Sequence, residues 1–305
     1  MAKALPQVLT DSAETIPVFS HLDQHFRLKM RGFIDIFAPP FYLSLMRTMK
    51  LEALRSTGIF PIMFFLDFES YKYPLRFDRL QTPFSLSLHR YAGGQDPQGP
   101  QDDRLMVRMV AELQGQQGSG KPGALVGDPF RGDQVTFARA SIVQMLTRPL
   151  APPGERQVSH LPEEGQALAE SPWTEAYPTA DLLDAVPPGF TEQFAPGWDT
   201  IEGVWGMPST DPNQHVNTQN YILGMENLGA HLLHGAGLAV ARHYTSRLRT
   251  LFKKPFFVGE TYRLRGRLFT QGHETLMFGH FHKPDGKGGY DERPAVVLRM
   301  EGQLE

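Results

Sequence analysis

Residues 253–269 read KKPFFVGETYRLRGRLF, and residues 72–88 read KYPLRFDRLQTPFSLSL. In each stretch a lysine and a proline mark a turn, after which apolar and polar side chains alternate as in a half-buried β-strand. Helix-like spacing precedes both stretches, over residues 41–57 in the first case and from about Asn217 in the second. When the two prolines are superposed the helices are nearly in register, which predicts an internal duplication of a helix-then-sheet unit.

A helix followed by several strands, with no further helix between them, cannot form a parallel crossover fold. It must instead pack against an antiparallel sheet. The sequence therefore predicts an α+β chain of two similar units, over residues 20–148 and 197–305. We expect residues 149–196 to form the linker between them, because their many prolines disfavour helices and sheet ladders.

Insertions rich in Gly, Gln and Pro interrupt the first unit over residues 93–103 and 115–132, with strand candidates over 105–113 and 134–146. The heptapeptide GQQGSGK that opens the second insertion has the spacing of a phosphate loop. A phosphate loop needs Ser or Thr after the lysine and a helix behind it, whereas this one continues with Pro122 and Gly123. We therefore do not expect nucleotide hydrolysis.

Composition excludes several classes of function. The 305 residues include no cysteine, which excludes disulfides, thiolate nucleophiles, cysteine-bound zinc and iron–sulfur clusters. The net charge of −3 excludes the overall basic field that non-specific nucleic-acid binding requires. The histidine pairs His231/His234 and His280/His282 have no carboxylate at ligand spacing, so we expect no metal site. We also expect no cofactor and no nucleic-acid partner.

The sequence also predicts where the protein resides. The N-terminus has no apolar targeting segment behind Lys3, and Asp11 and Glu14 argue against a transit peptide. The most hydrophobic stretch, residues 59–68, is about half of the ~20 residues that a membrane helix needs. We expect a cytoplasmic protein without a membrane span.

A dense run of polar side chains precedes the second helix, in residues 209–221, STDPNQHVNTQNY. Four of its polar residues alternate: Asp211, Asn213, His215 and Asn217. A purely structural interpretation exists, because Asp-Pro is ordinary turn chemistry and Asn is an ordinary helix N-cap. The residues alone leave the structural and functional interpretations about equally open.

The motif D-x-N-Q-H-V-N, with a tyrosine four residues later, resembles the active-site loop of hotdog-fold acyl thioesterases. The amino-acid sequence of the motif is most similar to that of the acyl-carrier-protein thioesterases, which carry two hotdog units in one chain. It is more distantly similar to that of the 4-hydroxybenzoyl-CoA thioesterase group. A hotdog unit is a long helix wrapped by an antiparallel sheet. The resemblance implies an intrachain pseudo-dimer of two tandem hotdog units with the site at their interface. Whether such chains form a homo-oligomer is left open.

The resemblance also implies a role for each residue in hydrolysis of an acyl-CoA or acyl-carrier-protein (acyl-ACP) thioester. Asp211 is the expected nucleophile or general base, with Asn213 orienting water or the substrate amide and His215 shuttling a proton or orienting its neighbours. The backbone N–H groups of Asn217 and Thr218, at the helix start, are the expected oxyanion donors.

Tyr221, Lys253 and Lys254 are the expected substrate-binding residues. The two lysines belong to a basic cluster whose only carboxylate is Glu260. Such a cluster suits the phosphates of CoA or the acidic surface of a carrier protein. A solvent-facing set of charges on antiparallel strands is the alternative. The members of the cluster are Arg242, Arg247, Arg249, Lys253, Lys254, Arg263, Arg265 and Arg267.

Two features depart from the resembling family. Its members carry a glutamate on the strand before the second turn, where this chain reads LFKK over residues 251–254; Glu226 is a weak substitute. The first unit has no such motif: we align residues 32–40 with the polar loop, with Asp35 as a relic, and interpret the unit as scaffold. Its aromatic residues are expected mainly in the core, although some could line an acyl pocket: Phe64, Phe65, Phe68 and Tyr71.

Two other functions remain open. Hotdog proteins include dehydratases and hydratases that act on acyl thioesters, although the DPNQH wording favours hydrolysis. A non-catalytic module that binds acyl groups or a partner is the third alternative, and the missing strand glutamate is the feature that keeps it open.

Overall fold

A computed structural model describes residues 5–48, 50–76, 78–121, 132–163, 166–193, 199–210 and 215–305. The chain divides into two compact units, Met1–Thr179 and Ala180–Glu305. The predicted linker is therefore shared, its first part lying in the first unit and its last part in the second. Each unit is described by itself.

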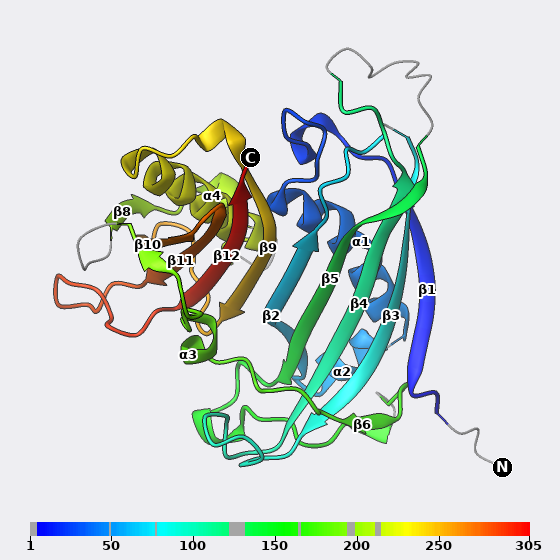
Figure 1. Ribbon diagram of the computed structural model, residues 1–305. Helices are drawn as coiled ribbons and strands as arrows, with labels where there is room; N and C mark the ends of the chain where they lie inside the picture. Colours follow the sequence, from blue (N-terminus) through cyan, green and yellow to red (C-terminus); the bar gives the residue numbers. More distant parts are fainter. Residues whose placement is uncertain are drawn as a thin grey trace. The chain divides into compact units, whose positions relative to one another are not determined.

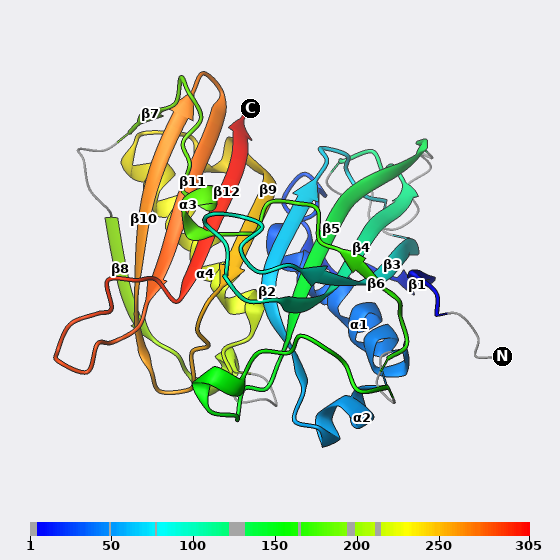
Figure 2. The same ribbon diagram turned by 90° about the horizontal axis from the view of Figure 1, so that it is seen from below.

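The first unit is an antiparallel sheet with a helix along one face (Figures 1 and 2). Its strands lie in the order β1-β3-β4-β5-β2, and β6 extends the same edge of β3 as β1. The elements are β1 (Val8–Thr15), α1 (Met30–Thr48), α2 (Leu51–Ser56), β2 (Phe60–Ser70), β3 (Leu80–Tyr91), β4 (Arg104–Gln116), β5 (Gln134–Thr147) and β6 (Glu170–Pro172), with short 3₁₀ turns at Phe19–His21 and Pro153–Glu155.

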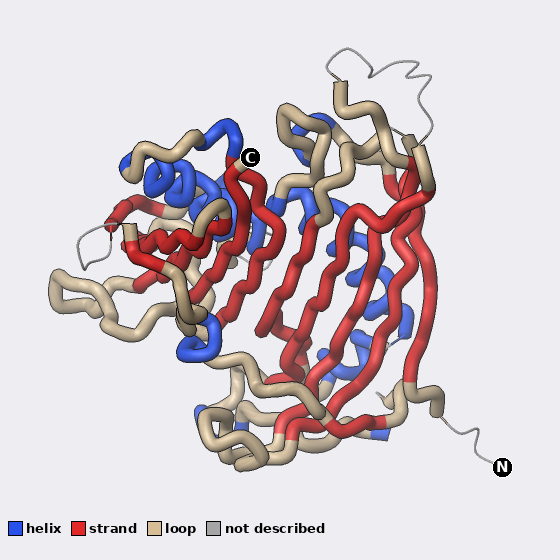
Figure 3. Tube along the Cα trace, viewed as in Figure 1, coloured by secondary structure: helices blue, strands red, loops and turns tan. Residues whose placement is uncertain are grey.

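The second unit repeats this plan, and Figure 3 shows the same preponderance of strand over helix in it. Its strands lie in the order β8-β10-β11-β12-β9, and β7 shares with β8 the outer edge of β10. The elements are α3 (Ala180–Leu183), β7 (Thr191–Glu192), β8 (Asp199–Val204), α4 (Thr218–Gly235), β9 (His243–Phe252), β10 (Thr261–Gln271), β11 (Glu274–His282) and β12 (Val296–Leu304), with 3₁₀ turns at Met207–Ser209 and Val240–Arg242.

The duplicated order that the sequence predicts is confirmed. In each unit an edge strand precedes the long helix, and four antiparallel strands follow it in the same spatial order. The proline turns occupy equivalent places, between β2 and β3 and between β9 and β10. The strand candidates 105–113 and 134–146 are also correct, as β4 and β5. No helix in the described part of the chain combines the length and apolar character that crossing a membrane would require.

Glycines allow α4 to lie close to its sheet. A Cβ atom at Gly266 of β10 would lie 2.4 Å from Leu228 Cδ2, and one at Gly279 of β11 would lie 2.3 Å from Met225 Sδ. Leu228 and Met225 face the sheet and are fully buried. A side chain at either glycine would require Leu228 or Met225 to shift, so the sheet uses glycine where these two helix side chains approach it most closely.

The core of the first unit is aromatic. Phe33 and Phe37 of α1 are fully buried, and the Phe33 ring stacks on Phe68 of β2 with 4.8 Å between ring centroids. Phe64 is also buried and packs against Tyr177 at 5.1 Å. These contacts give Phe64 and Phe68 the core role that we expected to be their main one.

The predicted start of the first helix was wrong, although the predicted range of 41–57 includes the end of α1 and all of α2. Residues 32–40 belong to α1 rather than to a loop, and α1 begins at Met30, eleven residues before the predicted start at Phe41. Pro39 and Pro40 lie inside α1, although proline lacks an N–H group and crowds the preceding turn. Burial of Phe33, Ile36 and Phe37 on one face of the helix outweighs that local cost.

Candidate functional site

The candidate loop lies between β8 and α4 of the second unit. Residues 211–214, which include Asp211 and Asn213, lie outside the described residues, so their roles stay predictions. The chain is paired on either side of them. Thr210 and Val216 form an antiparallel bridge, and the Asn217 N–H donates to the Ser209 carbonyl at 2.9 Å. The two ends of the loop are therefore held together in front of the helix.

Asn217 caps the helix, as predicted. Its backbone is extended, and its side-chain oxygen accepts a hydrogen bond from the Gln219 N–H at 2.8 Å. The Asn217 N–H is already engaged with Ser209, whereas Thr218 is the first helical residue and has no acceptor within α4. The predicted oxyanion role stays a prediction, and the Thr218 N–H suits it better than the Asn217 N–H.

His215 is held against the turn that follows β9. It pairs with Phe257 in an antiparallel bridge, and its half-buried ring lies edge-on to the Phe257 ring at 5.2 Å. The next residue continues this pairing, since the Val216 N–H donates to the Phe256 carbonyl at 2.8 Å. The polar motif and the KKPFFVGE turn, which are about forty residues apart in sequence, thus meet in the structure.

Tyr221 lies in the aromatic core beneath this junction. Its side chain is buried, with its ring centroid 5.4 Å from that of Trp205 and 5.3 Å from that of Phe281. Its hydroxyl oxygen accepts a hydrogen bond from the Phe256 N–H at 3.3 Å. Tyr221 therefore supports the turn from inside, and its predicted contact with substrate stays a prediction.

Many cations of the basic cluster already have carboxylate partners. Lys254 Nζ lies 2.9 Å from Asp291 Oδ2, and Lys253 is exposed beside it. On the sheet face opposite α4, Arg267 donates two hydrogen bonds to Glu192, at 2.7 and 2.8 Å. These bonds lower the pKa of the Glu192 carboxyl. Such pairing leaves Arg267 less available for a phosphate group, while substrate binding by Lys253 and Lys254 stays a prediction.

Three of the four other histidines that the sequence singled out have ordinary partners. His280 Nε2 lies 2.8 Å from Asp184, and His231 Nε2 lies 2.9 Å from Asp199. His282 Nδ1 donates to the Asp291 carbonyl at 2.8 Å, and burial lowers the pKa of its ring. Among the described residues no group of three or more His, Asp or Glu side chains is arranged to hold a metal ion.

A lysine that the sequence did not single out reaches the same junction. Lys283 follows β11, and its ammonium nitrogen lies 2.8 Å from both the Pro255 carbonyl and the Glu260 carboxylate. The same nitrogen lies 5.1 Å from the Phe256 ring centroid and 5.2 Å from the Phe257 ring centroid. No local pattern indicates this contact, because it depends on how β11 pairs with β10.

The first unit has a counterpart of the polar loop, but not at residues 32–40 as we predicted. It is the segment Asp23–Arg27, in which Gln24-His25-Phe26 precedes α1 as Gln214-His215-Val216 precedes α4. Phe26 accepts a hydrogen bond from the N–H of Leu75, the residue after the turn proline, at 2.8 Å. In the second unit the Val216 N–H donates to the carbonyl of Phe256, which is also the residue after a turn proline, at 2.8 Å. The repeated Gln-His dipeptide is the signal that could have located this segment.

Comparison with known proteins identifies the fold. No protein-family model matches the sequence, and no curated protein does. An acyl-ACP thioesterase from Bacteroides thetaiotaomicron (TM-score 0.57, 13% identity) and a 12:0-ACP thioesterase from Umbellularia californica (TM-score 0.58, 11% identity) each match over 97% of this chain and 98% of their own. A protein from Lactobacillus plantarum, provisionally assigned as an oleoyl thioesterase, matches over 97% of both chains (TM-score 0.65, 11% identity). These end-to-end matches show the fold of double-hotdog thioesterases.

Proposed function

We propose that this protein hydrolyses acyl thioesters of CoA or of an acyl carrier protein at the loop before α4. The observation that carries the proposal is the placement of His215, which pairs with the turn after β9 in front of a capped helix. The fold supports it, because the structures that match the chain end to end include acyl-ACP thioesterases. Fold alone does not establish an activity, so the proposal rests on this loop.

In the proposed mechanism Asp211 removes a proton from a water molecule that adds to the thioester carbonyl. The Thr218 N–H, at the positive end of the α4 dipole, stabilises the negative charge that develops on the carbonyl oxygen. When the tetrahedral intermediate collapses, the C–S bond breaks, and His215 relays the proton that Asp211 took from the water to the sulfur, which restores the Asp211 carboxylate. The products are a fatty acid and a free thiol. Asn213 orients the water or the substrate amide.

A covalent route uses the same residues. If the Asp211 carboxylate attacks the carbonyl directly, the thiol leaves and a mixed anhydride forms on the enzyme. Water then cleaves the anhydride, which restores the carboxylate and releases the acid. Both routes need Asp211 ionised and His215 held in place.

The proposal extends to the substrate and to the assembly of the protein. The names of the matching structures, which mention oleoyl and 12:0-ACP, favour a fatty-acyl group on CoA or on a carrier protein. Lys253, Lys254 and Tyr221 would contact this substrate. We further propose that the two units form an intrachain hotdog pseudo-dimer and that the protein acts in the cytoplasm. Association of these chains into a homo-oligomer is to be tested together with the pseudo-dimer.

Thiol release from acyl-CoA and acyl-ACP thioesters of increasing chain length tests the function. We expect saturable turnover of at least one of the two thioester series. His215→Ala should lower that turnover. Absence of thiol release with every thioester, from protein whose thermal unfolding is cooperative, would contradict it. Conversion of a 3-hydroxyacyl thioester into an enoyl thioester without thiol release would instead identify a hotdog dehydratase.

A further inference from the structure

Lys283 and Glu260 form a clamp on the turn that holds His215. The Lys283 side chain is only 16% exposed and that of Glu260 is 31% exposed, so this ion pair is partly withdrawn from water. One ammonium nitrogen spans the turn, from the Pro255 carbonyl at its start to the Glu260 carboxylate at its end. The Phe256 and Phe257 rings lie close to the same cation, an arrangement that desolvation strengthens.

The clamp acts directly on the residue that pairs with His215. The Glu260 carboxylate accepts a hydrogen bond from the Phe257 N–H at 2.9 Å, and the Glu260 N–H donates to the Phe257 carbonyl at 3.2 Å. Phe257 is therefore bonded to Glu260 on one side and paired with His215 on the other. A shift of the Glu260 carboxylate would move Phe257 and, through it, the imidazole.

The equivalent turn of the first unit is closed in a different way. There the Pro74 carbonyl accepts its hydrogen bond from a backbone group, the Gly118 N–H, at 2.8 Å. Leu75 pairs with Gln117 in the chain that continues from β4. Arg79 occupies the place of Glu260 when the turn prolines are superposed. Among the described residues, an ammonium group thus takes the place of this backbone hydrogen bond in the unit that carries the Asp-Pro-Asn-Gln-His motif.

A partly buried ion pair is weak evidence of a purely stabilising role. Removing two charges from water costs several kcal/mol, and their attraction recovers this only when further hydrogen bonds satisfy them. Here those bonds go to Pro255 and Phe257, on either side of the residue that packs on Tyr221. The clamp therefore fixes the turn that faces His215, in a chain that lacks the strand glutamate of the resembling family.

We propose that Lys283 and Glu260 are positioning residues for His215, and that their ion pair holds Phe257 in the position that orients the imidazole. This inference rests on the proposed function for its effect on turnover. Neither residue is proposed to touch the substrate. Loss of the pair should therefore lower kcat and leave KM nearly unchanged, since only the geometry of proton transfer is altered.

Lys283→Met is the informative variant, because it keeps an unbranched apolar side chain against the two Phe rings and removes the charge. We expect kcat to fall by about 10- to 100-fold with KM within about twofold of the wild type. Glu260→Gln should show a smaller fall, because its amide oxygen can still accept from the Phe257 N–H. Lys283→Arg restores a cation, and we expect it to recover part of the lost kcat.

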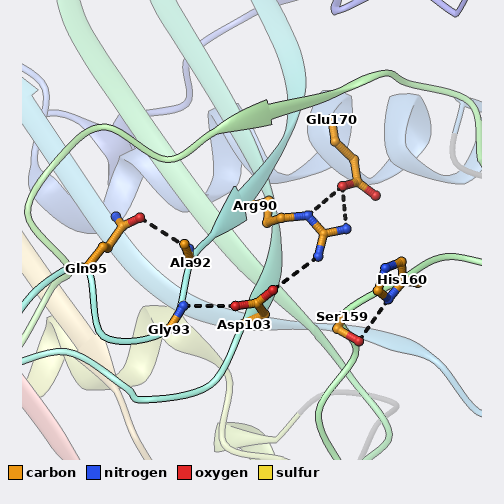
Figure 4. Close-up of polar contacts among 8 residues, drawn as sticks. All are labelled: Arg90, Ala92, Gly93, Gln95, Asp103, Ser159, His160 and Glu170. Carbon is orange, nitrogen blue, oxygen red and sulfur yellow. Dashed lines mark hydrogen bonds and ion pairs between the residues drawn. The ribbon is translucent and has the colours of Figure 1, made fainter.

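Arg90→Met is the matched control. Arg90 belongs to the first unit and forms an ion pair of similar exposure with Glu170, at 2.6 Å and with side chains 26% and 23% exposed. Figure 4 shows its guanidinium between the carboxylates of Glu170 and Asp103. This variant should lower the thermal midpoint without lowering kcat. A fall in kcat equal to that of Lys283→Met would overturn the inference, because it would indicate a general loss of packing.

A readout that needs no turnover separates this inference from the proposed function. The imidazole NMR signals of His215, assigned by their loss in His215→Gln, should move in Lys283→Met and stay in Arg90→Met. If they do not move and kcat is unchanged, the inference fails while hydrolysis by the wild type still stands. If the wild type hydrolyses no thioester but the signals move, the proposed function fails and the positioning survives. Should Lys283→Met not fold, Glu260→Gln and Lys283→Arg carry the same two measurements.

Discussion

The segments that precede the two long helices each pair with the turn that contains Pro74 or Pro255, and their described polar side chains are used differently. In the first unit the Asp23 carboxylate accepts hydrogen bonds from the His25 and Arg27 N–H groups and from the Arg27 guanidinium, at 2.7 to 2.9 Å. In the second unit Asn217 stands where Arg27 does, and its side chain caps the helix. In the first copy of the duplicated segment an arginine binds the carboxylate, which gives that copy a structural role. The second copy has Asn217 in place of this arginine, so no arginine at that position can bind a carboxylate.

The histidines of the two segments are the strongest test of this difference. We expect His215→Ala to lower kcat by about 10- to 100-fold, because a proton carrier or its orienting contact is lost. His25→Ala should leave kcat unchanged, because exposed His25 contacts the neighbouring Gln24 side chain and has no part in the proposed chemistry. Steady-state kinetics on both variants checks this. Equal losses would show that the first segment also serves the reaction.

Stability should show the opposite ranking. Arg27 is 5% exposed and its guanidinium holds Asp23 at 2.9 Å, so Arg27→Met should destabilise the protein by about 1 to 3 kcal/mol. Turnover well below the unfolding transition should not change. Urea unfolding combined with the thioester assay measures both quantities. A drop in kcat with no loss of stability would reverse the roles assigned to the two segments.

The ion pairs between arginine and glutamate on the two sheets should contribute less to stability, and their contributions should depend on pH in different ways. Hydrogen bonds from Arg267 lower the pKa of the Glu192 carboxyl in the second unit. A lowered pKa in the folded state means that the pair stabilises the fold above the ordinary pKa of a glutamyl carboxyl. The contribution disappears as the pH falls through the lowered value. Arg267→Met should therefore cost less than about 1 kcal/mol at neutral pH, and the difference from wild type should shrink on acidification.

The first unit offers the comparison for this pH effect. There the pKa of Glu112 is lowered first by its hydrogen bond from Gln114 and then by Arg139, whose side chain is 56% exposed. Because Gln114 remains, Arg139→Met should change the acid limb of the stability curve less than Arg267→Met. Unfolding curves over a series of pH values decide this. A larger acid-limb change in Arg139→Met would contradict the assignment.

Local signals were sufficient to predict the start of α4 and the strand β10 of the second unit. Asn217 has the side chain of an N-cap and stands directly before residues of helical spacing, so the start of α4 was predicted correctly. Alternation after Pro255 likewise predicted β10. In the first unit the local signal was misleading, because Pro39 and Pro40 lie inside α1 and their cost is outweighed by burial of the helix. The true counterpart of the polar loop, Asp23–Arg27, was missed because residues 32–40 of α1 were aligned with that loop instead.

The parts of the candidate site that could not be predicted are those made by distant pairing. Lys283 meets Pro255 because β11 lies beside β10, and nothing within a few residues of either one indicates that contact. The carboxylates that occupy the basic cluster also come from elsewhere, such as Glu192 of β7 and Asp291 of the loop before β12. Sequence showed an excess of arginine and lysine, and only the fold shows which of them are neutralised.

The carboxylate of Asp211, in the loop of the second unit, is the proposed base or nucleophile of thioester hydrolysis. Asp211→Asn keeps the shape of the side chain and the ability to form a turn while removing the carboxylate. Hydrolysis and the thermal midpoint should be measured on the same preparation, with Asp23→Asn alongside. We predict that Asp211→Asn lowers kcat by about 100-fold or more with an unchanged midpoint. A stable Asp211→Asn protein that hydrolyses thioesters at the wild-type rate would contradict the account.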